Sequence, residues 1–185
     1  MATAIESGEP AGAALFIPRV ETERLILREW RESDLDTFAR LYGDPQVTRY
    51  LGDGSTMDRG QAWRSMAVMI GHWVLRGYGQ WVIELKDTGE AIGRTGLINP
   101  EGWPGLEAGW VIDPAHQGKG YATEGGRTSI RWAFEQLGAD HVISLIHERN
   151  LASQRVAAKL GGVFERRVDV MGVETLVFGY TQPPP

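Results

Sequence analysis

The stretch LEAGWVIDPAHQGKGYATEG, residues 106–125, holds the features that decide the fold. Residues 106–112 are mostly apolar and predict a strand, in which Gly109 indicates a bulge. A helical pattern begins at Tyr121, and the loop before it has glycines at 118 and 120 on either side of Lys119. This loop leaves its backbone uncovered where the helix begins, so a ligand can come close to the main chain.

An anion is the natural ligand of such a loop. A helix N-terminus presents unpaired N–H groups and a partial positive charge, and glycines let a phosphate approach them directly. The Walker pattern of nucleotide-binding loops is absent, and the dinucleotide-binding pattern lacks its third glycine at residues 118–123. Two interpretations stay open at this point, a phosphate-binding loop and a glycine-rich turn that only reverses the chain.

The rest of the chain mixes strands and helices and predicts an α/β (α+β) fold. Strands are expected over 24–30, 106–112 and 141–147, and as two hairpins over 80–99 and 164–181. Helices are expected over 34–43, 58–77, 121–138 and 150–162. Ser33 is expected to cap the first of these helices. An apolar stripe in the second helix is expected to lie mostly in the core: Trp63, Met66, Ile70 and Trp73.

Length and composition indicate a single domain with a core of its own. We expect a flexible N-terminal tail, rich in Ala, Gly and Pro, over residues 1–18, followed by one folded domain over 19–185. The absence of cysteine excludes disulfides and thiolate chemistry and fits a cytoplasmic location. A net charge of −5 argues against general nucleic-acid binding, and no apolar run is long enough to span a membrane.

Residues 106–125 resemble the acetyl-coenzyme A segment of the GNAT N-acetyltransferases, which reads Q/R-x-x-G-x-G/A after a bulged strand. They resemble the ribosomal-protein-alanine (Rim-type) branch more closely, through Glu-x-Gly-aromatic at 107–110 and Gly-Lys-Gly-Tyr-Ala-Thr-Glu at 118–124. The opening segment 21–51 is similar to the same branch, as are the Asn-x-x-Ser and Lys-Leu-Gly patterns within 150–161. The resemblance runs in family order from about residue 20 to residue 181.

This resemblance implies a GNAT fold, a single mixed and mostly antiparallel central sheet flanked by helices, whose central strands 106–112 and 141–147 splay apart. Acetyl-coenzyme A would be the cosubstrate, with its pantetheine arm between these strands and its pyrophosphate on the N–H groups of residues 118–122. The Val111 amide would face the thioester carbonyl. The residues that the resemblance assigns to coenzyme binding are Val111, Ile112, Gln117, Gly118, Lys119, Gly120, Tyr121, Ala122, Thr123 and Asn150.

The resemblance also assigns two catalytic residues. Glu107 would be the general base, acting directly or through water, whereas the residues alone suggest a strand glutamate that faces solvent. Ser153 would be the acid or would hold the coenzyme sulphur, because the tyrosine that many GNAT enzymes use four residues later is Ala157 here. Helix capping is the alternative role for both Ser153 and Asn150. Trp103, in a loop, is a candidate to line the acceptor pocket.

The resemblance implies an N-acetyltransferase that moves the acetyl group of acetyl-coenzyme A to a primary amine by direct attack in a ternary complex. The alternative is a non-catalytic domain that binds or senses acyl-coenzyme A, although such a domain would need neither Glu107 nor Ser153. The four histidines show no metal-ligand spacing, so no metal is expected. The acceptor stays open between a protein N-terminus, an aminoglycoside, a polyamine and an amino acid, and the oligomeric state between a monomer and a homodimer.

Overall fold

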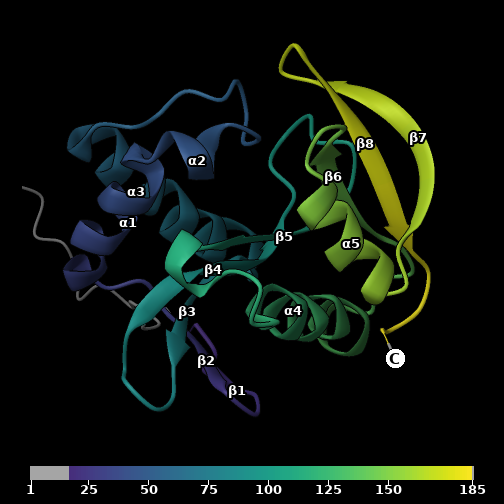
Figure 1. Ribbon diagram of the computed structural model, residues 1–185. Helices are drawn as coiled ribbons and strands as arrows, with labels where there is room; N and C mark the ends of the chain where they lie inside the picture. Colours follow the sequence, from purple (N-terminus) through teal and green to yellow (C-terminus); the bar gives the residue numbers. More distant parts are fainter. Residues whose placement is uncertain (1–16, 185) are drawn as a thin grey trace, which may run out of the picture.

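The computed structural model describes residues 17–184, which form one sheet of eight strands with helices on both faces (Figure 1). Within this described part the strand order is β1-β2-β3-β4-β5-β6-β8-β7, and only the β5–β6 pair is parallel. The strands are β1 (Val20–Glu21), β2 (Leu25–Arg28), β3 (Gln80–Leu85), β4 (Ala91–Ile98), β5 (Glu107–Ile112), β6 (Val142–His147), β7 (Val163–Val170) and β8 (Val173–Tyr180). The prediction of a single mixed, mostly antiparallel sheet is confirmed.

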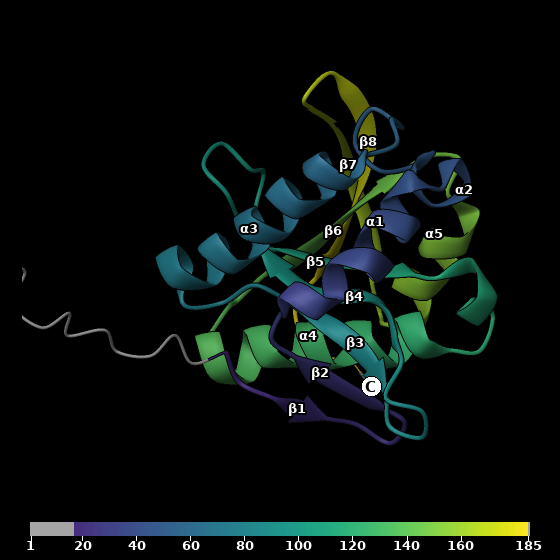
Figure 2. The same ribbon diagram turned by 90° about the vertical axis from the view of Figure 1, so that its left-hand side faces the viewer.

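The helices divide between the two faces of the sheet (Figure 2). They are α1 (Leu35–Gly43), α2 (Pro45–Thr48), α3 (Arg59–Arg76), α4 (Tyr121–Leu137) and α5 (Leu151–Lys159). α1 and α3 pack on one face, α4 packs on the other, and α5 lies beside α4 and β6. None of the helices in residues 17–184 is both long enough and apolar enough to cross a membrane.

Strand β3 shows why both faces of the sheet carry helices. Its side chains alternate between the two faces, as the pleat of a strand requires. Trp81 and Ile83 belong to the cluster that packs with α4, whereas Val82 belongs to the cluster of α1 and α3, with Phe38. All three strand side chains are almost fully buried. The sequence of a central strand that is buried on both faces is therefore a continuous apolar run, without the alternation of apolar and polar residues.

Most of the predicted elements are confirmed, with ends that differ by a few residues. α3 begins at Asp58, whose carboxylate accepts the Gln61 N–H at 2.7 Å, and it ends at Gly77, which has the left-handed φ of 74°. The apolar stripe of α3 lies mostly in the core, as Met66 does, but Trp63 near its start is 53% exposed.

Three features near the N-terminus differ from what the local sequence patterns predict. β1 and α2 were not predicted, because two and four residues are too few to give a periodic pattern. The prediction that Ser33 caps α1 is wrong. Ser33 lies in a 3-10 turn before this helix, and Asp34 takes the N-cap position. Asp34 is buried there because the guanidinium of Arg28 binds its carboxylate through two hydrogen bonds of 2.8 Å.

The folded domain begins earlier than expected. Ile17 is buried in the cluster that packs with α4, and the Pro18 carbonyl accepts a hydrogen bond from Trp81 Nε1 at 2.8 Å. These contacts place residues 17 and 18 with the domain and not with the tail. The rest of the expected tail, residues 1–16, lies outside the described residues.

Strands β5 and β6 meet at one point and then separate. Their only bridge in the described sheet joins Glu107 to Ile143, where the Ile143 N–H donates to the Leu106 carbonyl at 2.8 Å. Next along the strand, the Ala108 carbonyl accepts a hydrogen bond from the Ser144 hydroxyl at 2.7 Å. Pairing ends there, so the predicted splay of the two central strands is confirmed.

The bulge predicted at Gly109 is wrong. β4 and β5 keep one register along the whole of β5, without a shift. Because Gly109 has no side chain, it leaves a space on the face of the sheet, and the polar ends of neighbouring side chains surround this space.

Candidate active site

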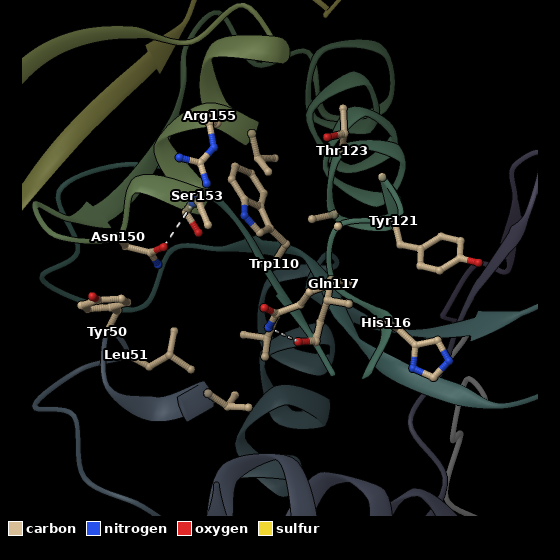
Figure 3. Close-up of a pocket in the computed structure, with 18 of the residues that line it drawn as sticks. Tyr50, Leu51, Trp110, His116, Gln117, Tyr121, Thr123, Asn150, Ser153 and Arg155 are labelled. Atoms are coloured by element: carbon tan, nitrogen blue, oxygen red, sulfur yellow. Dashed lines mark hydrogen bonds between the residues drawn. The ribbon is translucent and has the colours of Figure 1, made fainter. Parts of the chain in front are cut away.

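A cleft that encloses about 440 Å³ lies along the open edge of β5 (Figure 3). Its walls are the loop between β5 and α4, the first turn of α4, one side of α5 along its length, and the segment that begins in α2. Nine of the ten residues predicted to bind the coenzyme line it together: Val111, Ile112, Gln117, Gly118, Gly120, Tyr121, Ala122, Thr123 and Asn150. Lys119 does not line the cleft.

The loop between β5 and α4 offers backbone N–H groups to this cleft. Gly118 and Gly120 have left-handed φ values of 77° and 90°, which glycine adopts without strain. Gly120 is the N-cap of α4 and brings no side chain, so the N–H groups of the first turn have no capping partner. An anion such as a phosphate fits this position, because it meets these N–H groups and the positive end of the helix dipole.

Arg24, just before β2, fixes the loop from the opposite side. Its guanidinium donates to the Lys119 carbonyl at 2.9 Å and to the Glu124 carboxylate at 2.7 Å, and it lies over the Tyr121 ring. The Thr22 hydroxyl donates to the same carboxylate at 2.5 Å. No local pattern marks Arg24, because its two partners lie 95 and 100 positions away in the chain.

The register of β5 decides which main-chain groups face the cleft. The Asp113 N–H donates to a β4 carbonyl at 2.8 Å, and hydrogen-bonded residues alternate along an antiparallel ladder. The Val111 amide is therefore directed toward β4, which disagrees with the expectation that it faces the thioester. The main-chain groups of Trp110 and Ile112 face the open edge instead. Gln117 Nε2 donates to the Ile112 carbonyl at 2.9 Å, as Figure 3 shows.

A second cavity, of about 270 Å³, adjoins the first. It lies over β4, β5 and β6, between the loop before β5 and the β7–β8 hairpin. Both cavities are lined by the same five residues where they meet: Tyr50, Leu51, Trp110, Asn150 and Ser153. Figure 3 shows these side chains around the space where β5, α5 and the segment after α2 come together. A group bound in one cavity can therefore reach a group bound in the other.

Glu107 lies in the second cavity. Its Oε2 accepts a hydrogen bond from Trp103 Nε1 at 2.7 Å, so this loop tryptophan lines the same cavity. Burial raises the pKa of Glu107 to about 7, although the Trp103 hydrogen bond, the charge of Arg94 and the Leu145 N–H act in the opposite direction. A carboxyl group with this pKa exchanges its proton near neutral pH, which suits a general base.

Asn150 and Ser153 lie together at the start of α5. Asn150 Oδ1 accepts the Ser153 N–H at 3.1 Å, which confirms the capping role of Asn150 (Figure 3). Ser153 contributes only its main-chain N–H to this cap, and its hydroxyl forms no hydrogen bond with any residue among 17–184. The alternative that Ser153 is itself the cap is therefore wrong. Its hydroxyl lines the junction of the two cavities, where it can bind a ligand.

Basic side chains give the first cavity a local charge that the net charge of −5 does not reveal. The cavity is lined by Arg49, His116, Arg155 and Lys159. The spacing of Arg155 and Lys159, one helical turn apart, predicts a shared face that either reaches the phosphates of the coenzyme or is only solvated, whereas nothing in the sequence marks Arg49. Such a cluster suits a ligand with several phosphates. In residues 17–184 no three metal-ligating side chains converge, and the absence of a metal stays a prediction.

Comparisons with known proteins identify the family. Residues 24–163 match the family described as the acetyltransferase (GNAT) domain. The uncharacterized N-acetyltransferase p20 of Bacillus licheniformis is 32% identical over 142 residues, which cover 75% of this chain and 79% of that protein. The structure of an acetyltransferase from Agrobacterium tumefaciens strain C58 is similar with a TM-score of 0.82 and 32% identity, over 90% of this chain and 96% of that one. The chain belongs to the GNAT family.

Membership of the family fixes the class of reaction. The protein is an N-acetyltransferase that uses acetyl-coenzyme A, and the first of the two predicted functions is confirmed at this level. The ribosomal-protein-S5-alanine acetyltransferase of Vibrio fischeri shares the fold with a TM-score of 0.70 and 18% identity, over 89% of this chain and 97% of that one. A likeness at this identity concerns the fold alone and does not name the acceptor.

Proposed function

We propose that the enzyme transfers the acetyl group directly from acetyl-coenzyme A to a primary amine while both substrates are bound. The observation that carries this proposal is the junction of the two cavities at Trp110 and Ser153, with Glu107 in the second cavity. The coenzyme would occupy the first cavity and the amine the second, so that amine and thioester meet at the junction. The chain has no cysteine that could carry the acetyl group between them.

The first cavity supplies what the coenzyme needs along its length. The pyrophosphate would lie on the N–H groups of residues 118–122, with Arg155 and Lys159 near its charges. The pantetheine arm would follow the open edge of β5 and pair with the main-chain groups of Trp110 and Ile112, as an added strand does. Glycine at the start of α4 supports this placement, because the left-handed φ of 90° at Gly120 lets the chain turn there without strain and leaves the first-turn N–H groups without a capping side chain.

We assign the hydrogen bond to the thioester carbonyl to the Trp110 amide, in place of the Val111 amide. Both Trp110 and Ile112 turn their main chain to the open edge, but Trp110 lines both cavities and Ile112 lines only the first. The carbonyl that gains negative charge would lie at the junction. A backbone N–H held by the sheet can stabilise this charge without reorganising.

Glu107 and Ser153 would act on the two groups whose charge changes in the reaction, the attacking amine and the leaving thiolate. The attacking amine must lose a proton, and Glu107 would accept it directly or through one water. The leaving thiolate would receive a hydrogen bond from the Ser153 hydroxyl, which is not used for the helix cap. The pKa of Glu107 and the position of Ser153 at the junction support these roles.

A screen of amines tests the proposal. Free thiol release from acetyl-coenzyme A would be followed with an amino acid, a peptide with a free N-terminus, a polyamine and an aminoglycoside. We expect at least one amine to be acetylated, and the Glu107→Gln variant to lose roughly a hundredfold or more of the rate with it. Binding of acetyl-coenzyme A by calorimetry, with no thiol release for any class of amine, would contradict transfer to an amine.

A further inference from the structure

The second cavity contains a polar cluster that proton transfer does not explain. It lies over Gly109, where a Cβ would be 3.6 Å from Gln80 Nε2, 3.6 Å from Glu107 Oε1 and 4.0 Å from Arg94 Nη1. These three side chains come from the neighbouring strands β3, β5 and β4 and all line the cavity. Their heads therefore converge on one small space that the glycine leaves empty.

Arg94 brings a positive charge to this space, and it forms no ion pair with any residue in the described part of the chain. Its Nε donates to the Tyr42 hydroxyl and its Nη1 donates to Gln80 Oε1 at 2.6 Å, so both partners are neutral. Arg28, which is buried in the same sheet, instead has two carboxylate partners. Because Nη2 has no partner in residues 17–184, the guanidinium keeps donors for a ligand, and its fixed fork suits a carboxylate.

Gln80 aims a second donor at the same space. Its side chain is 3% exposed, and because its Oε1 accepts from Arg94, the orientation of the amide is fixed. Gln80 Nε2 therefore points toward the space over Gly109, and no described residue accepts a hydrogen bond from it. The atom is open to the cavity that Gln80 lines, so this N–H₂ group is free to donate to an oxygen atom of a ligand.

We propose that the amine acceptor carries a carboxylate beside its amine, as an α-amino acid does, and that Arg94 and Gln80 bind this carboxylate. This inference rests on the proposed transfer to an amine. The acceptor's amine would lie against Glu107, and its carboxylate would lie against the two donors. All three heads lie within 4.0 Å of one point, which matches the short separation of amine and carboxylate in an amino acid.

The outer wall of the cavity defines the rest of the acceptor. It is formed largely by apolar and aromatic side chains: Tyr50, Ile98, Trp103, Val170, Met171 and Val173. The volume of about 270 Å³ is close to the lower end of small-molecule sites, which is roughly 300 Å³. A free amino acid with an apolar side chain therefore fits this cavity better than an aminoglycoside or a polyamine does.

Matched acceptors test this inference. Phenylalanine, phenylalaninamide and phenethylamine share one ring and differ only at the carboxylate, and leucine, leucinamide and isoamylamine form a second series. We expect kcat/KM, from thiol release, to be at least about tenfold higher for the acid than for the amine without it, with the amide between them. Arg94→Gln should remove most of this preference, which is the ratio of the two kcat/KM values within the variant and so does not depend on the effect of the lost charge on Glu107. Arg131→Gln, on the outer face of α4, is the matched control and should keep the preference.

Gly109→Ala gives a second test that does not depend on the folding of Arg94→Gln. Its added methyl group would make ordinary contacts of 3.6 to 4.0 Å, so the variant should fold, but it would fill the space of the carboxylate. We expect it to raise KM for the acids by about tenfold and to bind acetyl-coenzyme A as the wild type does.

Three results would overturn the inference: equal kcat/KM for acid and plain amine, a higher value for a peptide or polyamine than for any free acid, or an unchanged preference in Arg94→Gln. In each of these cases an amine is still acetylated, so the proposed function stands. If no amine of any class releases thiol although acetyl-coenzyme A binds, the proposed function fails as well.

Discussion

Glu107 is a carboxyl group whose surroundings keep it partly protonated at neutral pH. Burial raises its pKa from the ordinary 4.5 to about 7, so the native protein holds this proton more tightly than the unfolded chain does. Two consequences follow at the scale of the residue. The free base appears only as the pH rises through about 7, and the stability that the protonated group contributes is lost between about 4.5 and 7.

We expect kcat/KM for the amine to rise with pH and to pass through an inflection near 7 that belongs to Glu107. Glu107→Gln should lose roughly a hundredfold or more and should lack this inflection, while it binds acetyl-coenzyme A normally. Its melting temperature at pH 8 should be no lower than that of the wild type, because the substitution removes a buried charge. Glu135→Gln, on the exposed face of α4, is the control. A wild-type pH profile in Glu107→Gln would mean that this residue is structural.

Ser153→Ala separates catalysis from helix capping. Since Asn150 provides the cap and Ser153 contributes only its N–H, we expect almost no change in melting temperature. The loss of the hydroxyl should lower kcat by roughly tenfold to a thousandfold, and it should raise KM for the coenzyme by less. Steady-state kinetics together with thermal unfolding would measure both effects. A loss of kcat below about twofold would leave no role for this hydroxyl in the reaction.

Single residues of the site could be predicted from sequence only where a local motif marks them. The loop glycines, Glu107 and Asn150 lie in such motifs. Arg94 and Gln80 do not, because β3 and β4 bring them over Gly109 from positions that are distant in sequence. The direction of each amide in β5 also needs the register with β4, which no pattern within one strand can give.

At the scale of elements, the start of α4 forms the site that we propose for the phosphates of the coenzyme. A strand ends, two glycines turn the chain, and the helix begins with its N–H groups uncovered. Arg24 and Glu124 hold this turn to the edge of the sheet near β2. The site is therefore a property of how two elements are joined and not of any single side chain.

Gly120→Val should weaken the binding of acetyl-coenzyme A strongly. The φ of 90° would strain valine by roughly 1–3 kcal/mol, and its Cβ would lie 3.3 Å from Arg24 Nη2, so the turn that presents the first-turn N–H groups would shift. Gly138→Val is a matched control, because Gly138 ends the same helix with a left-handed φ of 64° and open space around it. Both variants should lose stability, Gly120→Val by at least as much as the control because of the added contact with Arg24, but calorimetry should show weakened binding only for Gly120→Val. Equal affinities in the two folded variants would exclude phosphate binding by this loop.

Longer elements were predicted by their periodicity, and short ones were not. α3 and α4 carry enough turns for an apolar face and capping residues to stand out. β1 and α2 are too short for this, and Ser33 was misread because the buried pairing of Asp34 with Arg28 shifts the start of α1. Tertiary contacts made by distant residues decide such ends.

At the scale of the whole molecule, the splay of β5 from β6 places two cavities side by side. One of them is lined by the glycine loop between β5 and α4, the other contains Glu107, and both are lined by Trp110 and Ser153. Periodicity alone does not predict such a separation of parallel neighbours, and it was expected here only through the family resemblance. The arrangement suits two substrates that are bound at the same time.

Initial-rate kinetics test this central claim most directly. The rate of thiol release would be measured over a grid of acetyl-coenzyme A and amine concentrations, with the best acceptor from the screen. Exchange of label between acetyl-coenzyme A and free coenzyme A would be measured without amine. Direct transfer between adjoining cavities predicts intersecting double-reciprocal lines and no exchange without amine. Parallel lines, together with rapid exchange in the absence of amine, would show an acetylated enzyme and would contradict it.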